Sequence, residues 1–591
     1  MQNIFRLLAV NFLGQSPTWY KITILSFLVL NPLLFFCLPN QVEGFEYIEH
    51  FGHFVAGWAV LIQFIFALAC ALKCYPLQPG GLLAIEALFI GLTDPKTIYH
   101  EVLGNAPTLL LLIFMVSAIY FIKDVLFIGM TKLFLAFRKK YVLALVFCVL
   151  CASLSAFLDA LTLVAIAIAV CFNFYAIYHR VESDSGNDEE MEEFRGFLRD
   201  LIIHGAVGTI IGGAMTEVGE PQNIMIGHKM DWSFLEFIIH CGPVSFPAAF
   251  AGFFVCFALE FFRCPGFQYQ MPDRARELIQ KDYAKKMNEM TGQNFYVYAV
   301  QIIAFVMLVF ALAFHIAEVG LIGIGLIVFV TAFTGLTKEH DIGGAFVNAM
   351  PFAVLIVVFF AILGVVHSQH LVTPLAEWVF KFEDPTSKLL ALFFTNGTLS
   401  FISDNVFVAT VFITEVESAY VNGVIAQMIP EIQANYDHGT MGPFVEALRG
   451  AVTAVADKTE WTDEMRQYIG IFEGTIHKTA WSNETVVQFI SKLESANMKG
   501  TVDEFIIATK DVYANKTIIT SREFERLAVV VNMGTNIPAM ATPNGHAALL
   551  FLLTSSLAPL LKLSYLKMIE LTLPYTIVMT TTGALAIYFF V

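Results

Sequence analysis

Two aspartates stand inside long apolar segments of this chain. Asp159 lies in the run Phe-Leu-Asp-Ala-Leu-Thr, and Asp404 lies in the run Ile-Ser-Asp-Asn-Val. A charged group at bilayer depth costs roughly 3 kcal/mol or more, so it marks a cavity or a functional partner. The segments that carry them, 141–178 and 388–421, are too long for one clean helix. We therefore expect two re-entrant hairpins with an aspartate at each tip; the alternative, a structural aspartate that caps a broken helix, stays open.

Glycine and proline interrupt two further apolar segments, 201–227 and 524–552, where Thr, Asn and Gln gather around each break. Such breaks free backbone carbonyls and add neutral oxygens. Several oxygens together with a carboxylate suit a hard cation such as Na⁺, whereas paired carboxylates repel an anion. The candidate ion ligands are Asp159, Asp404, Asn405, Thr162, Ser155, Ser403, Thr216, Glu220, Asn223, Thr542 and Asn544, with Na⁺ placed at Asp159 and Asp404.

A desolvated carboxylate can hold a proton in place of Na⁺. Competition between Na⁺ and H⁺ for one site, with only loaded states crossing, is enough to produce exchange. His546, just after the second break, is a weaker candidate that would tune the pH response or line the cavity. For His204 and Glu260 a packing or snorkelling role is favoured over transport. No Gly-rich Lys-Ser/Thr phosphate loop is present, and we expect neither an enzyme nor a cofactor.

The composition agrees with a membrane location. Of the 591 residues, 57% are hydrophobic and 14% charged, and the mean hydropathy is +0.69. A soluble protein of this size cannot bury that much apolar surface, so we expect a polytopic membrane protein in contact with lipid. The net charge of −16 argues against a nucleic-acid partner.

Apolar windows predict about 11 transmembrane helices, and the basic residues orient them. The windows are 20–38, 55–73, 80–93, 107–128, 201–227, 235–258, 296–314, 318–336, 347–366, 524–552 and 568–590. The connections 129–140 and 263–294 are rich in Lys and Arg and are therefore predicted to be cytoplasmic, as is the N-terminus. The hydrophilic segment 430–516 then lies on the outer, periplasmic face.

Short motifs recur at a nearly fixed spacing. Gly91-Leu-Thr matches Gly335-Leu-Thr, Ser155 to Asp159 matches Ser400 to Asp404, and Thr216 to Gly219 matches Thr542 to Gly545. Because the two halves have opposite predicted topology, the fold class is an all-α polytopic membrane protein with two inverted-topology repeats, hairpins and broken helices. The predicted division is an N-terminal span 1–54, a first repeat 55–262, a connection 263–294 and a second repeat 295–591, interrupted by 430–516.

With these residues in view, the chain resembles the NhaB family of bacterial sodium/proton antiporters, within the wider ion-transporter superfamily. The matching stretches are Asn11 to Pro17, Ala71 to Leu77, Phe157 to Thr162, Val218 to Asn223, Ile402 to Val408 and Ala541 to Gly545. The resemblance implies electrogenic exchange of Na⁺ or Li⁺ for H⁺ in a bacterial inner membrane, with Asp159 and Asp404 at matching motif positions. It also implies a two-hairpin transport domain, a scaffold domain, homodimers and elevator-like movement.

Two features depart from the pattern expected of the family. The segment 430–516 reads as an added helical cap with an unknown partner, or as an acidic loop. Glu217 stands where an apolar residue is expected. The main rival function is a sodium-coupled dicarboxylate symporter or another anion transporter of the same fold, against which the tip aspartates argue. A membrane receptor that uses the cap to bind a partner is the third alternative.

Overall fold

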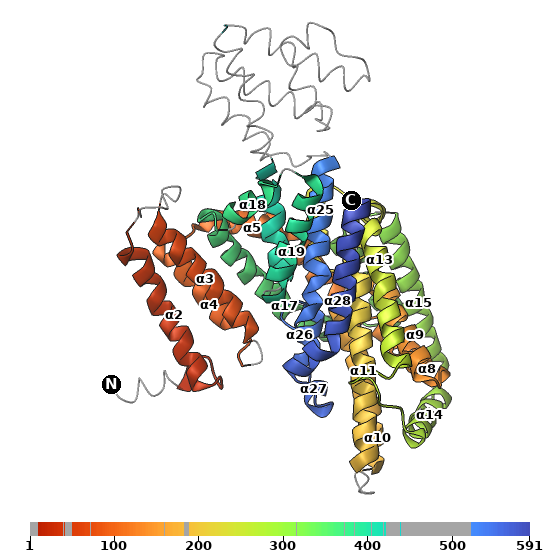
Figure 1. Ribbon diagram of the computed structural model, residues 1–591. Coiled ribbons are helices and arrows are strands. Elements are labelled where there is room, and N and C mark those ends of the chain that lie inside the picture. Colours follow the sequence, from red (N-terminus) through yellow and green to blue (C-terminus); the bar gives the residue numbers. More distant parts are fainter. Residues whose placement is uncertain are drawn as a thin grey trace.

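The computed structural model describes residues 10–39, 41, 50–70, 73–158, 160–182, 188–314, 316–371, 373–382, 384–402, 405–417, 419–420, 438 and 522–591. Every regular element within these ranges is a helix, as the composition predicts (Figure 1). Asp159, Ser403, Asp404 and nearly all of the segment 430–516 lie outside the described residues.

Three N-terminal helices stand together at the left of Figure 1. They are α2 (Thr18–Cys37), α3 (Phe51–Ala69) and α4 (Leu77–Ile90). Apolar side chains alone do not drive helices together in lipid, so polar contacts help to specify this packing. The Asn31 amide supplies them, because it donates to Gln63 Oε1 at 2.8 Å and to Glu86 Oε2 at 2.7 Å.

The segment predicted as one crossing at 107–128 is bent. It consists of α6 (Ala106–Leu110), the π-helix η1 (Leu111–Met115), α7 (Val116–Tyr120) and α8 (Lys123–Ala136), with a bend of 60° between the last two parts. The predicted connection 129–140 is helical over most of its length, because α8 continues to Ala136, and its cytoplasmic location stays a prediction. The turn at Phe121, whose N–H bonds to the carbonyl three residues back, interrupts the helical ladder and redirects the chain.

The first half contains α9 (Lys140–Ser155), α10 (Ala160–Glu182) and α11 (Asp188–Gly213), followed by η2 (Glu217–Gly219) and α12 (Pro221–Met230). Lys140 contacts Asp200, and Gly212 packs on the backbone of Ala152, so α9 and α11 run parallel. The helix α10, which lies between them in the sequence, must therefore run in the opposite direction. Because α10 is itself long and apolar enough to cross a membrane, the re-entrant character of 141–178 stays a prediction.

The helix α13 (Phe234–Phe261) closes the predicted first repeat, the amphipathic α14 (Asp273–Asn288) lies in the predicted connection, and α15 (Gly292–Ala313) opens the predicted second repeat. That second repeat also contains α16 (Val319–Thr334), α17 (Glu339–Ser368), α18 (Thr373–Phe380), α19 (Pro385–Ile402) and helical residues 405–417. After the undescribed segment come α25 (Arg522–Asn536), η3 (Pro538–Ala541), α26 (Ala547–Thr554), α27 (Leu557–Leu560) and α28 (Tyr565–Phe590). Residues 213–221 and 536–547 are breaks between helices, as the Gly and Pro pattern predicts.

Among the described residues, six helices are long and apolar enough to cross a membrane, or seven if the bent pair is one span. They are α2, α3, α10, α13, α15 and α28, with Ile113–Ala136 as the bent pair. Four further apolar helices have 10–17 residues. Each segment of a broken helix is by itself shorter than a membrane span. The 11 crossings and the inverted repeats therefore remain predictions.

Candidate ion-binding site

Each break is tied to the end of a preceding helix by one threonine. The hydroxyl of Thr216 donates to the carbonyl of Ala156 at 2.8 Å, just beyond the end of α9. The hydroxyl of Thr542 donates to the carbonyl of Phe401 at 2.6 Å, near the end of α19. These are corresponding positions of the two predicted repeats. Each hydroxyl hydrogen is used in its bond to a carbonyl, but the lone pairs of the hydroxyl oxygen stay available to coordinate a cation.

Backbone packing around the two breaks also corresponds. A Cβ at Gly208 would collide with the carbonyl of Cys148, and one at Gly534 would lie 2.9 Å from the carbonyl of Phe393. Further along, Gly212 packs on Ala152, and Pro538 lies against Gly397. Small residues therefore let α11 approach α9, and α25 approach α19, at backbone distance.

Buried amides join the two breaks across the centre of the molecule. Gln222 donates to Asn536 Oδ1 at 2.8 Å, and Asn536 donates to Asn223 Oδ1 at 3.0 Å and to the carbonyl of Asn532 at 2.9 Å. Asn223 donates in turn to the carbonyls of Gly213 and Thr216 at 2.7 and 2.6 Å. The predicted ligand Asn223 thus braces the first break, because both of its amide hydrogens are committed to freed carbonyls.

Glu220 of the first break faces His546 of the second. Glu220 Oε1 lies 3.2 Å from His546 Nε2, and the two side chains are 3% and 0% exposed. His546 Nδ1 accepts a hydrogen bond from the backbone N–H of Ala548 at 3.3 Å. The two facing atoms are in contact but form no hydrogen bond, and both are buried without a hydrogen-bond partner.

Several buried polar atoms near the ends of α9 and α19 and at the two breaks have no hydrogen-bond partner. They include the hydroxyls of Ser155 and Ser400, both side-chain amide atoms of Asn405, Asn544 Oδ1 and Glu220 Oε1. Ser155 and Asn405 are completely buried. Buried polar atoms without partners are rare and costly, and an ion or water normally satisfies them. The predicted ligands Ser155, Asn405, Asn544 and Glu220 therefore offer oxygens without hydrogen-bond partners.

Helix ends of both polarities surround the breaks. The helices α9, α11, α19 and α25 end there, whereas α10, α12 and α26 begin there. C-terminal ends favour a cation and N-terminal ends favour an anion, so the helix ends alone do not select the sign of an ion. The preference for a cation rests on the oxygens.

A cavity of about 750 Å³ reaches the site from one side. Thr162 of α10 and Asn544 line it, with Leu550 and Thr554 of α26 and the charged pair Lys123 and Asp124 of α8. Most of the other lining residues are apolar. Two predicted ligands therefore border a passage between α8, α10, α17 and α26.

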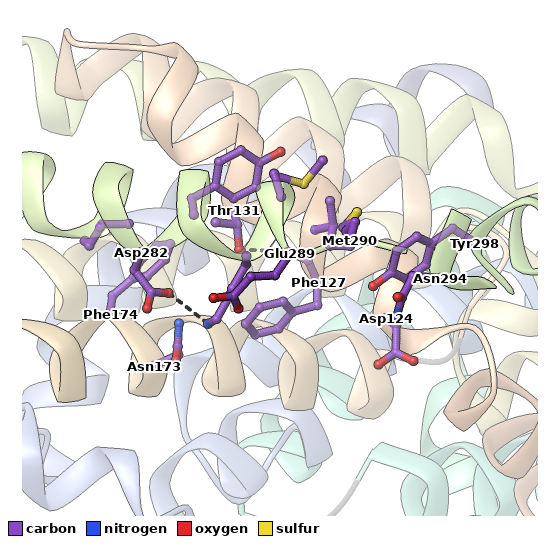
Figure 2. A pocket seen from close by; sticks show the side chains of 15 residues that line it. Asp124, Phe127, Thr131, Asn173, Phe174, Asp282, Glu289, Met290, Asn294 and Tyr298 are labelled. Atoms are coloured by element: carbon purple, nitrogen blue, oxygen red, sulfur yellow. Dashed lines mark hydrogen bonds and ion pairs between the residues drawn. The ribbon is translucent and has the colours of Figure 1, made fainter. Parts of the chain in front are cut away.

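A second cavity, of about 340 Å³, lies beyond Asp124 (Figure 2). Its lining comes from α8, α10, α14 and the start of α15, and it includes Asn173 and Tyr298. Lys286 pairs with Asp282 at 2.8 Å along α14, so this lysine is already neutralised within its own helix. Asp124 and Phe127 line both cavities and form the wall between them.

Glu217 does not join the Glu220 contact. Its side chain is 7% exposed and lines a separate cavity of about 300 Å³, together with Glu318 at the start of α16. The two break glutamates therefore face different surroundings.

Sequence reasoning missed four residues of this centre. Gln222, Asn532, Asn536 and Ser400 were not proposed as ligands or braces, although the first three lie at the breaks. Ser400 corresponds to Ser155 under the repeat, and that correspondence was the available signal. The link from Gln222 to Asn536 spans 314 residues and has no local signal.

Apolar spans around an oxygen-rich centre, built where helices are interrupted, define a polytopic membrane transport protein. The model of the family described as bacterial Na⁺/H⁺ antiporter B (NhaB) matches residues 1–455 and 486–591. The chain therefore belongs to the NhaB family.

Curated relatives named Na⁺/H⁺ antiporter NhaB are similar over nearly the full length. The relative from Teredinibacter turnerae is 41% identical over 597 residues, covering 98% of this chain and 97% of its own. The relative from Saccharophagus degradans is 43% identical over 590 residues, covering 97% and 96%. The relative from Vibrio atlanticus is 40% identical over 597 residues, covering 98% and 92%.

These matches correct one expectation about the segment 430–516. It is not foreign to the family, because the family model covers all of it except residues 456–485, and the relatives align with 97–98% of the chain. Composition alone had suggested an added module, since a hydrophilic stretch contrasts with apolar spans whether or not relatives share it.

Proposed function

We propose that this chain exchanges Na⁺ or Li⁺ for H⁺ across a bacterial inner membrane. Its relatives are named Na⁺/H⁺ antiporters. The observation that carries the proposal for this chain is the set of buried, unpartnered oxygens of Ser155, Asn405, Asn544 and Glu220 beside two interrupted helices. Asp159 and Asp404 complete this set as carboxylates that hold Na⁺ or H⁺ in turn.

The two halves act as inverted repeats around one midplane site. The matching bonds from Thr216 to Ala156 and from Thr542 to Phe401 support this, as does the matching packing of Gly208 and Gly534. In Figure 1, α25 begins near the top and leads down to α26, whereas α11 rises from the lower end beside α10. Opposite directions of corresponding helices are what an inverted repeat requires.

The cavity of about 750 Å³ is the cytoplasmic access path in this conformation. Thr554 at its rim precedes Lys562 and Lys567, and Lys123 starts the helix that leads to the basic run Arg138 to Lys140. Basic residues mark the cytoplasmic side of a membrane protein. The N-terminus then lies inside, and the segment 430–516 lies in the periplasm.

Alternating access results if the rigid body that holds the ion site moves relative to a second rigid body, the scaffold. The body with the breaks comprises residues 140–261, 385–417 and 522–590, and the scaffold comprises the N-terminal helices with α15, α16 and α17. Because the access cavity is lined from both bodies, a relative shift would close it on one side. We further propose that the scaffold forms a homodimer, which cross-linking of the protein in native membranes would test.

The test is the collapse of an imposed pH gradient in everted membrane vesicles. Wild type, Asp159→Asn and Asp404→Asn are compared on addition of Na⁺, Li⁺, K⁺ or succinate. Asp384→Asn is the matched control, since Asp384 is an exposed aspartate that accepts the N–H of Ser387 at the start of α19, a bond that Asn retains.

The proposal expects a response to Na⁺ and Li⁺ in wild type and control, and its loss in either site variant. A wild-type protein that ignores both cations and takes up succinate would instead make the chain a dicarboxylate transporter. Full activity of both site variants would remove the aspartates from the exchange centre.

A further inference from the structure

A buried cluster of charged side chains lies at the base of α9, far along that helix from the breaks. Lys140 Nζ lies 2.6 Å from Asp200 Oδ2 and 3.0 Å from Glu260 Oε1. His204 Nε2 lies 2.9 Å from the same Glu260 oxygen, and His204 Nδ1 lies 2.6 Å from the Tyr575 hydroxyl. We call Lys140, Asp200, His204 and Glu260 the α9-base cluster.

The α9-base cluster joins four helices and is closed to solvent. Its members come from α9, α11 and α13, and Tyr575 belongs to α28. The side chain of Lys140 is 3% exposed, and those of Asp200, His204 and Glu260 are 0% exposed. Lys140 also donates to the carbonyl of Phe267 at 3.2 Å, which seals the cluster beneath the chain that follows α13.

The charges of the α9-base cluster do not balance. One lysine faces two carboxylates, so a neutral His204 leaves a net charge of −1 in a site without water contact. Asp200 Oδ1 and Glu260 Oε2 are buried and have no hydrogen-bond partner. An uncompensated buried charge is costly, and one more proton removes it.

Within the part of the chain that the structure describes, no other charged group forms an ion pair with the α9-base cluster. Arg199 lies next to Asp200 on α11, but its guanidinium donates to the carbonyl of Leu561 and lies over the ring of Tyr269. The remaining titratable groups that face the cluster are the thiol of Cys256, with Cys148 behind it, and the phenol of Tyr575, none of which carries positive charge.

We propose that the α9-base cluster is a proton-binding site, separate from the exchange centre, whose bound proton is shared between His204 and Glu260. The ligand is H⁺ alone, because the lysine ammonium fills the space between the two carboxylates that a metal ion would need. Sharing a proton at a contact of 2.9 Å gives either an imidazolium beside a carboxylate or a carboxylic acid beside a neutral ring.

The position of the cluster connects it to the exchange centre. Lys140 is the first residue of α9 and Ser155 is the last, so one rigid helix of 16 residues, about 24 Å, joins the two. Release of the proton leaves a net negative charge at the base of α9 and weakens its attachment to α11 and α13. The site thereby couples the pH on the side of the basic connection before α9 to the position of Ser155 at the other end of that helix. This role rests on the proposed antiport.

The first test measures proton binding without transport. The purified full-length protein in detergent, free of Na⁺, is melted between pH 7 and pH 9 as wild type, Glu260→Gln and Asp200→Asn. Either substitution balances the charges without the extra proton while keeping a hydrogen-bonding side chain. The control is Glu570→Gln, which removes an exposed glutamate of α28 that pairs with Lys567 at 2.8 Å.

A proton held by the folded state alone makes stability fall as pH rises. We expect the melting temperature of wild type and of Glu570→Gln to fall over this range, and that of Glu260→Gln and Asp200→Asn to change less. Potentiometric titration of the folded protein is expected to release one proton fewer from each cluster variant. The proposal would be overturned if the cluster variants melt and titrate as the wild type does. If either Glu260→Gln or Asp200→Asn fails to fold, the remaining variant decides.

The coupling is tested separately by the pH profile of exchange in proteoliposomes. The cluster variants are expected to flatten its alkaline side, whereas Glu570→Gln keeps the wild-type profile. An unchanged profile with altered proton release would keep the binding site and remove the coupling. Because melting and titration need no Na⁺, their outcome is independent of the proposed antiport.

Discussion

Glu220 Oε1 lies 3.2 Å from His546 Nε2, so the two interrupted helices meet through residues that occupy corresponding positions of the two halves. Both side chains are buried, and His546 Nδ1 accepts the N–H of Ala548. Glu220 Oε1 and His546 Nε2 have no hydrogen-bond partner, although they face each other. A buried carboxylate oxygen without a partner suits a cation, so Glu220 stays a predicted ligand beside the predicted ligands Asp159 and Asp404.

Replacing His546 is expected to weaken the binding of Na⁺. His546→Ala removes the buried side chain that lies 3.2 Å from Glu220 Oε1, so this predicted ligand loses the group that holds it in place. We expect the KM for Na⁺ to rise about tenfold, as the loss of about 1.4 kcal/mol implies. His546→Gln, which keeps a polar side chain at the contact, should recover part of the loss. Exchange kinetics in proteoliposomes measure the KM, with exposed His100→Ala as control; an unchanged KM in His546→Ala would argue against this role.

The two threonines of the breaks are expected to behave alike. Thr216→Val and Thr542→Val each lose one hydrogen bond to a carbonyl, to Ala156 or to Phe401, and leave it unsatisfied. Each should lower stability by about 1 kcal/mol and reduce exchange severalfold, while the Ser variants keep both. Thr581→Val is the control, because that exposed hydroxyl bonds only within its own helix. Thermal melting and exchange assays measure the effects, and a strong effect of one threonine without the other would count against equivalent half-sites.

Close helix packing makes Gly212 irreplaceable. A Cβ there would collide with the carbonyl of Ala152, which is backbone and cannot move aside. Gly212→Ala should therefore separate α11 from α9 and destabilise the fold by roughly 1–3 kcal/mol or more. Gly325→Ala in α16 meets nothing within 4 Å and should be tolerated. Yield and melting temperature of the two purified variants decide, and equal stability would mean that α9 and α11 lie farther apart than described.

The access cavity is expected to open to the cytoplasm. In a background where the four less buried cysteines, at positions 37, 70, 74 and 264, are serine, Leu550→Cys and Thr554→Cys should react with a membrane-impermeant thiol reagent in everted vesicles. Intact right-side-out vesicles should protect them, because the proposed access path leads to the cytoplasm. Val306→Cys on the lipid-facing side of α15 should stay unlabelled in both. Labelling from the outer side only would reverse the proposed orientation.

The sequence by itself determined the class of protein and the places where its helices break. Apolar length, and Gly and Pro within apolar segments, act through local backbone physics, so the interruptions at 213–221 and 536–547 follow from composition alone. The bend after Tyr120 has no Gly or Pro beside it in the sequence, so the pattern that predicts a crossing at 107–128 does not indicate the bend. The tip positions of Asp159 and Asp404 stay predictions, since they lie outside the described residues.

Only the tertiary structure decided which polar groups meet. His204 and Glu260 are predicted from the sequence to be packing residues, yet Glu260 forms buried contacts with both His204 and Lys140. Gln222 and Asn536 bond across 314 residues, and Glu220 finds His546 in the opposite half. Helix periodicity reports which face of a helix is buried, but the partner on the facing helix depends on how the whole chain packs. Burial makes each of these contacts energetically important, because a polar group removed from water needs an opposite charge or a hydrogen-bond partner within the protein.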